Sequence, residues 1–199
     1  MADSFVYLVR HGRPVLPDDR RRFLGQADPP LSPAGLEQAH RMAERLRAVR
    51  FDAAHSSDLR RCLETAAIIV DAGARCAEPE GAPCIHTHED LREIDAGLWE
   101  GLTVEEARER YPREWAQRER DLVGYRFPGG ESYQDLSERV LPAFARIVSG
   151  GGRNVLVVSH RGPMRILLCQ YLDLPLDRVF SFAADYGSVE ILKVPPTPV

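Results

Sequence analysis

Residues 155–160 read VLVVSH, and this stretch decides the fold that we expect. Its first four residues are all apolar, which is typical of a central parallel strand that helices cover on both faces. The run ends in the polar pair Ser159-His160, and Gly162-Pro163 soon after it predicts the start of a helix. A buried strand that leads directly into a helix indicates an α/β fold.

Runs with strand-forming character also lie on either side of this stretch. They predict strands at residues 5–11, 51–57, 84–88 and 188–194. Between them, apolar residues recur at steps of three and four, which predicts amphipathic helices. Ser32-Pro33 has the pattern of a helix N-terminus, and Ser132 with Asp135 fits a capping box. Pro142 lies within the helix that Ser132 opens, and we expect it to kink or shorten that helix.

The alternation of strands and helices predicts a three-layer α/β/α sandwich with a mostly parallel central sheet. We expect one domain over residues 1–199. At about residues 98–127 the alternation is interrupted by a helical segment that is rich in charge. This segment is predicted to form a small helical cap over one end of the sheet. Trp99 and Trp115 fall within it and are expected to pack there.

The net charge of the 199 residues is −4, which argues against a general attraction to nucleic acid or to an anionic membrane. The first ten residues lack the pattern of a signal peptide, and no apolar run approaches the roughly 18 residues of a membrane span. We therefore expect a cytoplasmic protein whose four cysteines are reduced thiols. Their spacing has no C-x-x-C zinc pattern, so we expect no metal site. An edge strand near the C-terminus leaves a homodimer as an open alternative.

Polar residues gather where the predicted strands end. They belong to four separate segments of the chain, which are Arg10-His11, Ser56-Ser57, Glu93 and Ser159-His160. In open α/β sheets, ligands bind beyond the carboxyl ends of the strands. Helices that begin at this edge favour an anion through their exposed N–H groups and their dipoles. The sequence therefore predicts an anion site that is assembled from distant segments.

Four motifs occur in order along the chain: LVRHG at 8–12, SSDLRR with ETA at 56–61 and 64–66, LREID with GLWEG at 91–95 and 97–101, and VVSH at 157–160. Two supporting stretches are GQADPPLSPAG at 25–35 and PGGES at 128–132. Together these motifs resemble the histidine phosphatase superfamily, which includes cofactor-dependent phosphoglycerate mutase. The resemblance runs from about residue 4 to about residue 194.

The resemblance implies that His11 is the nucleophile, whose neutral imidazole attacks phosphorus and forms a phosphohistidine. Arg10 and Arg61 would clamp the phosphoryl oxygens, because guanidinium groups match that geometry. His160 would donate a hydrogen bond to the same oxygens as charge develops on them. Glu93 would protonate the leaving oxygen and then deprotonate the attacking water. Such a mechanism uses no cofactor.

Other polar residues near these motifs are expected to have structural roles. We expect Ser57 to cap the helix that follows it and Arg165 to form a structural ion pair. His55, which precedes the serine pair, is also interpreted as structural. His86 and His88 alternate along a strand and so share one face, but the sequence shows no third metal ligand beside them.

The chain departs from the family pattern beside both histidines. Arg13-Pro14 follows Gly12, where glutamate and a threonine or serine are common, and Arg161 follows the second histidine, where glycine is usual. We hypothesise that Arg13 and Arg161 point into the mouth of the pocket and suit a substrate with extra negative charge. Gly12 and Gln26 are further candidates for substrate binding.

We expect a metal-independent phosphomonoesterase of the histidine acid phosphatase type that acts on a small-molecule phosphomonoester. The segment at 111–127 is short, and this form resembles α-ribazole phosphatase and broad-specificity phosphatases, whereas the mutases carry a longer insertion. Phosphoryl transfer of the phosphoglycerate mutase type is the alternative activity. A non-catalytic regulatory module that binds phosphate is another alternative. Within the phosphate site, Arg60 is the alternative to Arg61.

Overall fold

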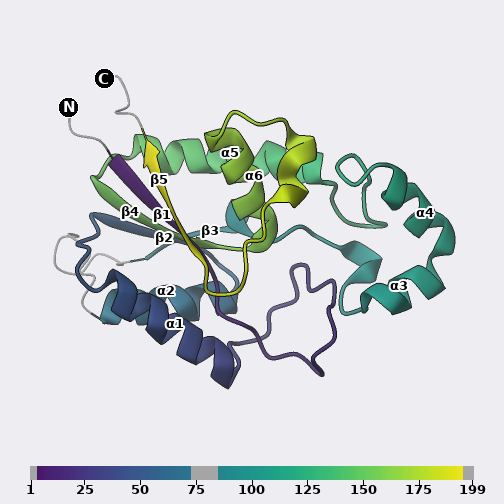
Figure 1. Cartoon of the computed structure of the whole chain (residues 1–199), viewed down its shortest axis with the longest axis horizontal. Coiled ribbons are helices and arrows are strands. Elements are labelled where there is room, and N and C mark those ends of the chain that lie inside the picture. Colours follow the sequence, from purple (N-terminus) through teal and green to yellow (C-terminus); the bar gives the residue numbers. More distant parts are fainter. Residues whose placement is uncertain (1–3, 73–84, 195–199) are drawn as a thin grey trace.

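The computed structural model describes residues 4–72 and 85–194 of the chain. Its elements, in chain order, are β1 (Ser4–Arg10), α1 (Pro33–Leu46), β2 (Ala53–Ser57), α2 (Arg60–Asp71), β3 (His86–His88), the 3₁₀ helices η1 (Glu89–Leu91) and η2 (Gly97–Trp99), α3 (Val104–Arg110), α4 (Pro112–Arg120), α5 (Tyr133–Ser149), β4 (Asn154–Ser159), α6 (Arg161–Tyr171), the 3₁₀ helix η3 (Leu176–Ser181) and β5 (Val189–Val194). Figure 1 shows one sheet with helices on both faces, and α3 with α4 set apart at one end.

The five strands form a single sheet in the order β3-β2-β4-β1-β5. The pairs β1–β4, β2–β4 and β2–β3 are parallel, and only β5 runs antiparallel to its neighbour β1. The strand at residues 154–159 is therefore central, as its unbroken apolar run predicts, and its residues 155–159 are all buried. The mostly parallel sheet is confirmed. Because Arg10 is the register partner of Ser159, the polar ends of β1 and β4 lie side by side.

Helices cover the two faces of the sheet as separate layers (Figure 1). Val9 and Val158 pack with buried residues of α1 and α2 on one face. Leu8 and Val157 pack with buried residues of α5 and α6 on the other face. Adjacent strand residues thus enter opposite cores, which explains why β1 and β4 are apolar at successive positions. The three-layer α/β/α arrangement is confirmed. Within residues 4–72 and 85–194, no helix is both long and apolar enough to cross a membrane.

The sequence locates most element boundaries to within a few residues. The strand expected at 51–57 begins at Ala53, and the strand expected at 84–88 begins at His86. The side chain of Ser32 caps α1, and Ser132 opens α5 with the predicted capping box. Of the four cysteines, those at positions 76 and 84 lie outside the described residues, and Cys62 and Cys169 are free.

The sequence predicts that Pro142 kinks or shortens its helix, and the predicted shortening is wrong. α5 continues through this proline to Ser149. Proline costs a helix one backbone hydrogen bond and introduces a steric clash. Here the helix also buries Val140, Ala143 and Ile147 against the sheet. We infer that burial of this face, at about 25 cal/mol per Å² of apolar surface, outweighs the local cost of the proline.

The segment predicted to form a cap contains η2, α3 and α4, and its aromatic rings pack into the core that covers one face of the sheet. Trp99 is fully buried, and its ring stacks on that of Trp115 with 5.7 Å between centroids. Phe23, from the loop after β1, packs against Trp99 at 5.3 Å. The backbone N–H of Phe23 donates to the carbonyl of Leu102, and that of Gly101 donates back to the carbonyl of Phe23. These contacts join the cap to the loop that follows the end of β1.

Candidate active site

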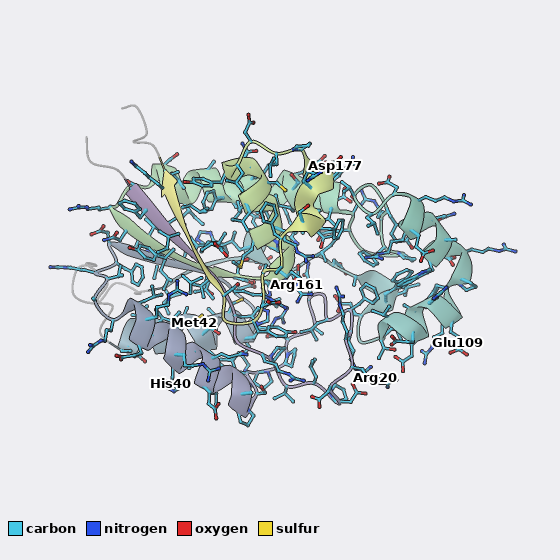
Figure 2. All side chains as sticks on the ribbon, viewed as in Figure 1. Arg20, His40, Met42, Glu109, Arg161 and Asp177 are labelled. Carbon is cyan, nitrogen blue, oxygen red and sulfur yellow. The ribbon has the colours of Figure 1, made fainter. Side chains whose placement is uncertain are left out.

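A cavity of about 800 Å³ opens at the carboxyl ends of the parallel strands, between the sheet and the cap. It is lined by side chains from β1, from the following loop, from α2, from the cap and from the start of α6. Arg10, His11, Arg61, Glu93 and Arg161 are among them. Figure 2 shows Arg161 near the middle of the molecule, where these elements meet. Residues far apart in the sequence thus come together at the predicted sheet edge.

His11 is almost completely buried at the end of β1. Its Nδ1 lies 2.7 Å from the carbonyl oxygen of Gly12, and Nε of Arg61 donates to its Nε2 at 3.3 Å. Because a carbonyl can only accept, Nδ1 must carry the proton and Nε2 keeps its lone pair. Burial, followed by the charges of Arg61 and Arg10, holds the pKa of His11 well below its usual value. The imidazole is therefore neutral, which is the form that a nucleophile requires.

Gly12, a predicted substrate contact, has a clear packing role. A side chain at this position would place its Cβ 2.4 Å from the carbonyl oxygen of Gly35. The backbone N–H of Gly12 also donates to Oγ1 of Thr65 at 3.1 Å. This close approach of two backbones explains the glycine, because any Cβ would force them apart. The close approach also fixes the carbonyl group of Gly12, which accepts the hydrogen bond that sets the tautomer of His11.

Two buried arginines flank His11. Nη1 of Arg10 donates to the carbonyl of Ala184 at 2.8 Å, and its guanidinium lies 3.8 Å from the ring centre of Tyr186. Burial, and next the charge of Arg161, lowers the pKa of Arg10 to about 10, so it stays charged at neutral pH. Arg61 donates to two loop carbonyls, those of residues 27 and 25, at 2.5 and 2.9 Å. The guanidinium of Arg61 is thereby held beside Nε2 of His11, and that of Arg10 is held at the wall of the same cavity.

The two adjacent arginines at the start of α2 lie in different surroundings. Arg61 is 1% exposed and lines the cavity. Arg60 is exposed, and its Nε pairs with Glu64 at 2.7 Å. Successive residues of a helix point in directions about 100° apart, so only one of the two can face the site. That residue is Arg61.

His160 is fully buried beside His11, with 4.9 Å between the ring centroids. Its Nε2 lies 2.9 Å from Oγ of Ser57 and 3.3 Å from Sγ of Cys62. Burial, and next the charge of Arg61, holds the pKa of His160 well below its usual value. Both site histidines are therefore neutral.

The sequence missed the contact of Ser57 with His160. The N-cap position of α2 is Leu59 and not Ser57, although Oγ of Ser57 accepts a long 3.4 Å hydrogen bond from the N–H of Leu59. The capping expectation is therefore wrong in its position. Because β2 and β4 are neighbours in the sheet, serine and histidine at their ends come into contact. Strand order, which the sequence did not provide, is the missing signal.

Glu93 reaches the cavity from the segment after β3. Its Oε1 accepts hydrogen bonds from the backbone N–H groups of Ile94 and Gly162, both at 3.0 Å. A Cβ at Gly162 would lie 2.3 Å from this oxygen, so only glycine allows the approach. Within the described part of the chain, Oε2 has no hydrogen bond. One oxygen of Glu93 is thus anchored while the other remains available for proton transfer.

The remaining predicted residues separate into two groups. Arg13 and Arg161 both line the cavity, but Nη2 of Arg13 is paired with Asp19 at 2.6 Å. Gln26 does not line the cavity. Its backbone N–H donates to Glu100 at 2.5 Å, and its side chain lies 3.4 Å from the carbonyl of residue 93. Arg165 donates to the carbonyl of Phe182 at 2.7 Å, so the expected ion pair is replaced by a backbone contact.

A cluster of three histidines lies away from this cavity. Nδ1 of His55 is 2.9 Å from Nε2 of His88, and the rings of His55 and His86 stack at 5.2 Å. In the described residues, no group of three or more histidine, cysteine, aspartate or glutamate side chains is arranged to hold a metal ion. The cluster packs β2 against β3, in line with the structural interpretation of His55.

We expect the free energy of unfolding to fall as the pH drops from about 7.5 to about 5. The unfolded chain binds protons near the ordinary histidine pKa of about 6.5, whereas His11 and His160 resist protonation in the folded state. Above about pH 6.5 the two histidines make their full contribution to the free energy of unfolding. Below that pH this contribution falls by up to about 1.4 kcal/mol per pH unit for each histidine. Urea unfolding measures the slope. His160→Asn should make this slope against pH less steep, whereas His40→Asn, which replaces an exposed histidine, should leave it unchanged. A free energy of unfolding that does not vary with pH in the unmodified protein would contradict the depressed pKa values.

The comparisons with known sequences agree with this site. A sequence model of the histidine phosphatase superfamily (branch 1) matches residues 6–197. The 6-phosphofructo-2-kinase/fructose-2,6-bisphosphatase of Gallus gallus is 38% identical over 170 residues, which are 84% of this chain and 33% of that protein. The chain spans about a third of the length of such curated relatives.

Solved structures share the fold over nearly their whole length. A putative α-ribazole-5′-P phosphatase from Escherichia coli has a TM-score of 0.85 at 25% identity, covering 98% of this chain and 92% of that one. The protein YhfR of Bacillus stearothermophilus has a TM-score of 0.80 at 34% identity, covering 94% and 90%. A mycobacterial glucosyl-3-phosphoglycerate phosphatase has a TM-score of 0.76 at 25% identity, covering 96% and 97%. With the family match and the shared fold, this chain is a member of the histidine phosphatase superfamily.

Proposed function

We propose that the protein is a metal-independent phosphomonoesterase that works through a phosphohistidine on His11. The observation that carries this proposal is the state of His11. It is buried and neutral, its Nδ1 proton is committed to the carbonyl of Gly12, and its Nε2 lone pair lies beside Arg61 in the cavity. A neutral nitrogen nucleophile between fixed guanidinium groups is suited to attack a phosphate dianion.

The reaction then has two steps, and each conserves its protons. Nε2 of His11 forms a bond to phosphorus as the bond to the ester oxygen breaks, and Glu93 gives that oxygen its proton. Water next attacks the phosphohistidine, Glu93 takes a proton from the water, and the phosphorus–nitrogen bond breaks. Arg10 and Arg61 offset the charge of the phosphoryl oxygens, with His160 as a further donor.

Water as the acceptor is favoured over a second substrate hydroxyl by the small cap, which has only two α-helices among its described residues. The neighbours with the same fold include proteins named as phosphatases. The names of these neighbours and of the curated relatives suggest the first compounds to test, namely α-ribazole phosphate, glucosyl-3-phosphoglycerate and fructose 2,6-bisphosphate. A cytoplasmic location and a small-molecule substrate stay predictions.

Incubation with 3-phosphoglycerate and catalytic 2,3-bisphosphoglycerate separates hydrolase from mutase. We expect inorganic phosphate to be released from the metabolite panel, with no 2-phosphoglycerate formed from 3-phosphoglycerate. Product analysis by ³¹P NMR reports both reactions in the same sample. Isomerisation faster than phosphate release would assign the mutase activity instead. Phosphate binding without either reaction would indicate the regulatory module.

A further inference from the structure

The cavity beside His11 has far more cationic than anionic side chains. Nine of the residues that line it are arginines, and only Asp19 and Glu93 are carboxylates. The chain as a whole has a net charge of −4, so this positive charge is concentrated locally. A cavity that is lined mainly by charges of one sign attracts ligands of the opposite charge. Two arginines are enough to offset the charge of one phosphate dianion. The presence of the other arginines in the cavity therefore needs a separate explanation.

Most of these arginines are engaged within the protein. Three are in ion pairs: Arg13 with Asp19, Arg20 with Asp18 and Glu106, and Arg22 with the same two acids. Three donate to backbone carbonyls: Arg10 to Ala184, Arg61 to Gly25 and Ala27, and Arg165 to Phe182. On the cap side, Arg118 lies 5.5 Å from the ring centre of Trp115. These contacts account for seven of the nine guanidinium groups, and of the other two, Arg21 and Arg161, Arg21 is exposed.

Arg161 differs from them. It is the first residue of α6, directly after His160. Its Nε is buried without a hydrogen-bond partner, as is Nε of Arg10. Unlike Arg10, whose Nη1 donates to the carbonyl of Ala184, Arg161 has no side-chain hydrogen bond or ion pair with any described residue. Arg161 lines the same cavity as Arg10 and His11, and its charge contributes to the lowered pKa values of both. A buried N–H without a partner costs free energy until a ligand supplies an acceptor.

We propose that Arg161 binds a second anionic group of the substrate, a carboxylate or a phosphate attached close to the phosphate ester that His11 attacks. The inference rests on the proposed function and narrows its substrate class. A guanidinium fork binds either kind of oxyanion in a bidentate manner. Because Arg161 and Arg10 line the same cavity, we place the second anionic group only a few bonds from the phosphate ester.

Matched substrates test this assignment. 2-Phosphoglycerate and glycerol 2-phosphate differ only by a carboxylate in place of a hydroxymethyl group, and glycerol 1,2-bisphosphate supplies a second phosphate instead. For the preferred acid, Arg161→Gln should lower kcat/KM by roughly 10- to 100-fold, the value of a hydrogen bond to a charged group. For glycerol 2-phosphate the loss should stay under about threefold, because its phosphate is held by Arg10 and Arg61. The two acids show whether carboxylate or phosphate is preferred.

Three further variants serve as controls. Arg161→Lys keeps the charge and should restore part of the preference. Arg47→Gln removes the same charge from the exposed end of α1 and should change no ratio. Arg118→Gln removes a cavity arginine on the cap side. If it abolishes the preference and Arg161→Gln does not, the second anion binds at the cap and the assignment is overturned.

Binding to the His11→Ala protein gives a readout without turnover. Calorimetric Kd values should show the same selective loss when Arg161→Gln is added to it. Equal losses for all three compounds, no loss for any, or no preference in the unmodified protein would each overturn the role of Arg161. Selective binding without any phosphate release would keep the second-anion site and contradict the phosphatase activity.

Discussion

His11→Ala should lower kcat for phosphomonoester hydrolysis by roughly 10⁴- to 10⁶-fold, as loss of a covalent nucleophile does in other enzymes. The Nε2 atom that would bond to phosphorus is then missing, while Arg10 and Arg61 still bind the phosphate. KM should therefore change much less than kcat. The measurement is phosphate release from the best substrate of the metabolite panel. Brief reaction with a ³²P-labelled substrate should trap an acid-labile, base-stable phosphoenzyme only where His11 is present.

The matched control for this variant is His40→Ala. His40 lies exposed on α1, away from the cavity (Figure 2). The His40→Ala protein is purified in the same way. Full activity in this variant therefore excludes a loss of activity caused by the purification. A thermal unfolding curve for His11→Ala confirms that the variant is folded. Turnover retained within about tenfold of the unmodified protein would overturn the phosphohistidine mechanism, since general positioning alone leaves far less activity.

The residues of the site could be predicted because two rules combine. Apolar runs mark the parallel strands, and the carboxyl ends of parallel strands meet at one edge. His11, Arg61 and His160 stand at strand ends or at the start of the next helix, so their meeting follows from the fold. The choice of Arg61 over Arg60 follows from helical geometry once the start of α2 is known.

Side-chain partners could not be predicted in the same way. Arg13 and Arg161 seemed equivalent in the sequence. In the structure Asp19 forms an ion pair with Arg13, whereas Nε of Arg161 has no hydrogen-bond partner. This pairing depends on the path of the loop after Gly12, which has no periodic pattern to reveal it. The contact of Ser57 with His160 depends on strand order. The prediction for Pro142 failed because it rested on the low helix propensity of proline alone. It did not include the apolar surface that α5 buries.

Glu93→Gln should lower kcat for alkyl phosphates by roughly 10²- to 10⁴-fold, the usual contribution of a general acid–base group. Glutamine has the same shape, and its carbonyl oxygen can still accept from the N–H groups of Ile94 and Gly162. Position is therefore kept while proton transfer is lost. With p-nitrophenyl phosphate, whose leaving group needs little protonation, formation of the phosphohistidine should be less affected than its hydrolysis.

The variant should therefore release p-nitrophenol in a burst of about one equivalent per site, followed by slow turnover, because water attacks without a base. Quenched-flow measurement of the burst, together with trapping of the phosphoenzyme, separates the two steps. Glu44→Gln, which changes an exposed carboxylate of α1, should show unmodified kinetics. If Glu93→Gln loses the same factor for alkyl and nitrophenyl esters and accumulates no phosphoenzyme, Glu93 is not the proton carrier. Its bond to the N–H of Gly162 at the start of α6 would then be its main role, in holding the helix that presents Arg161 to the cavity.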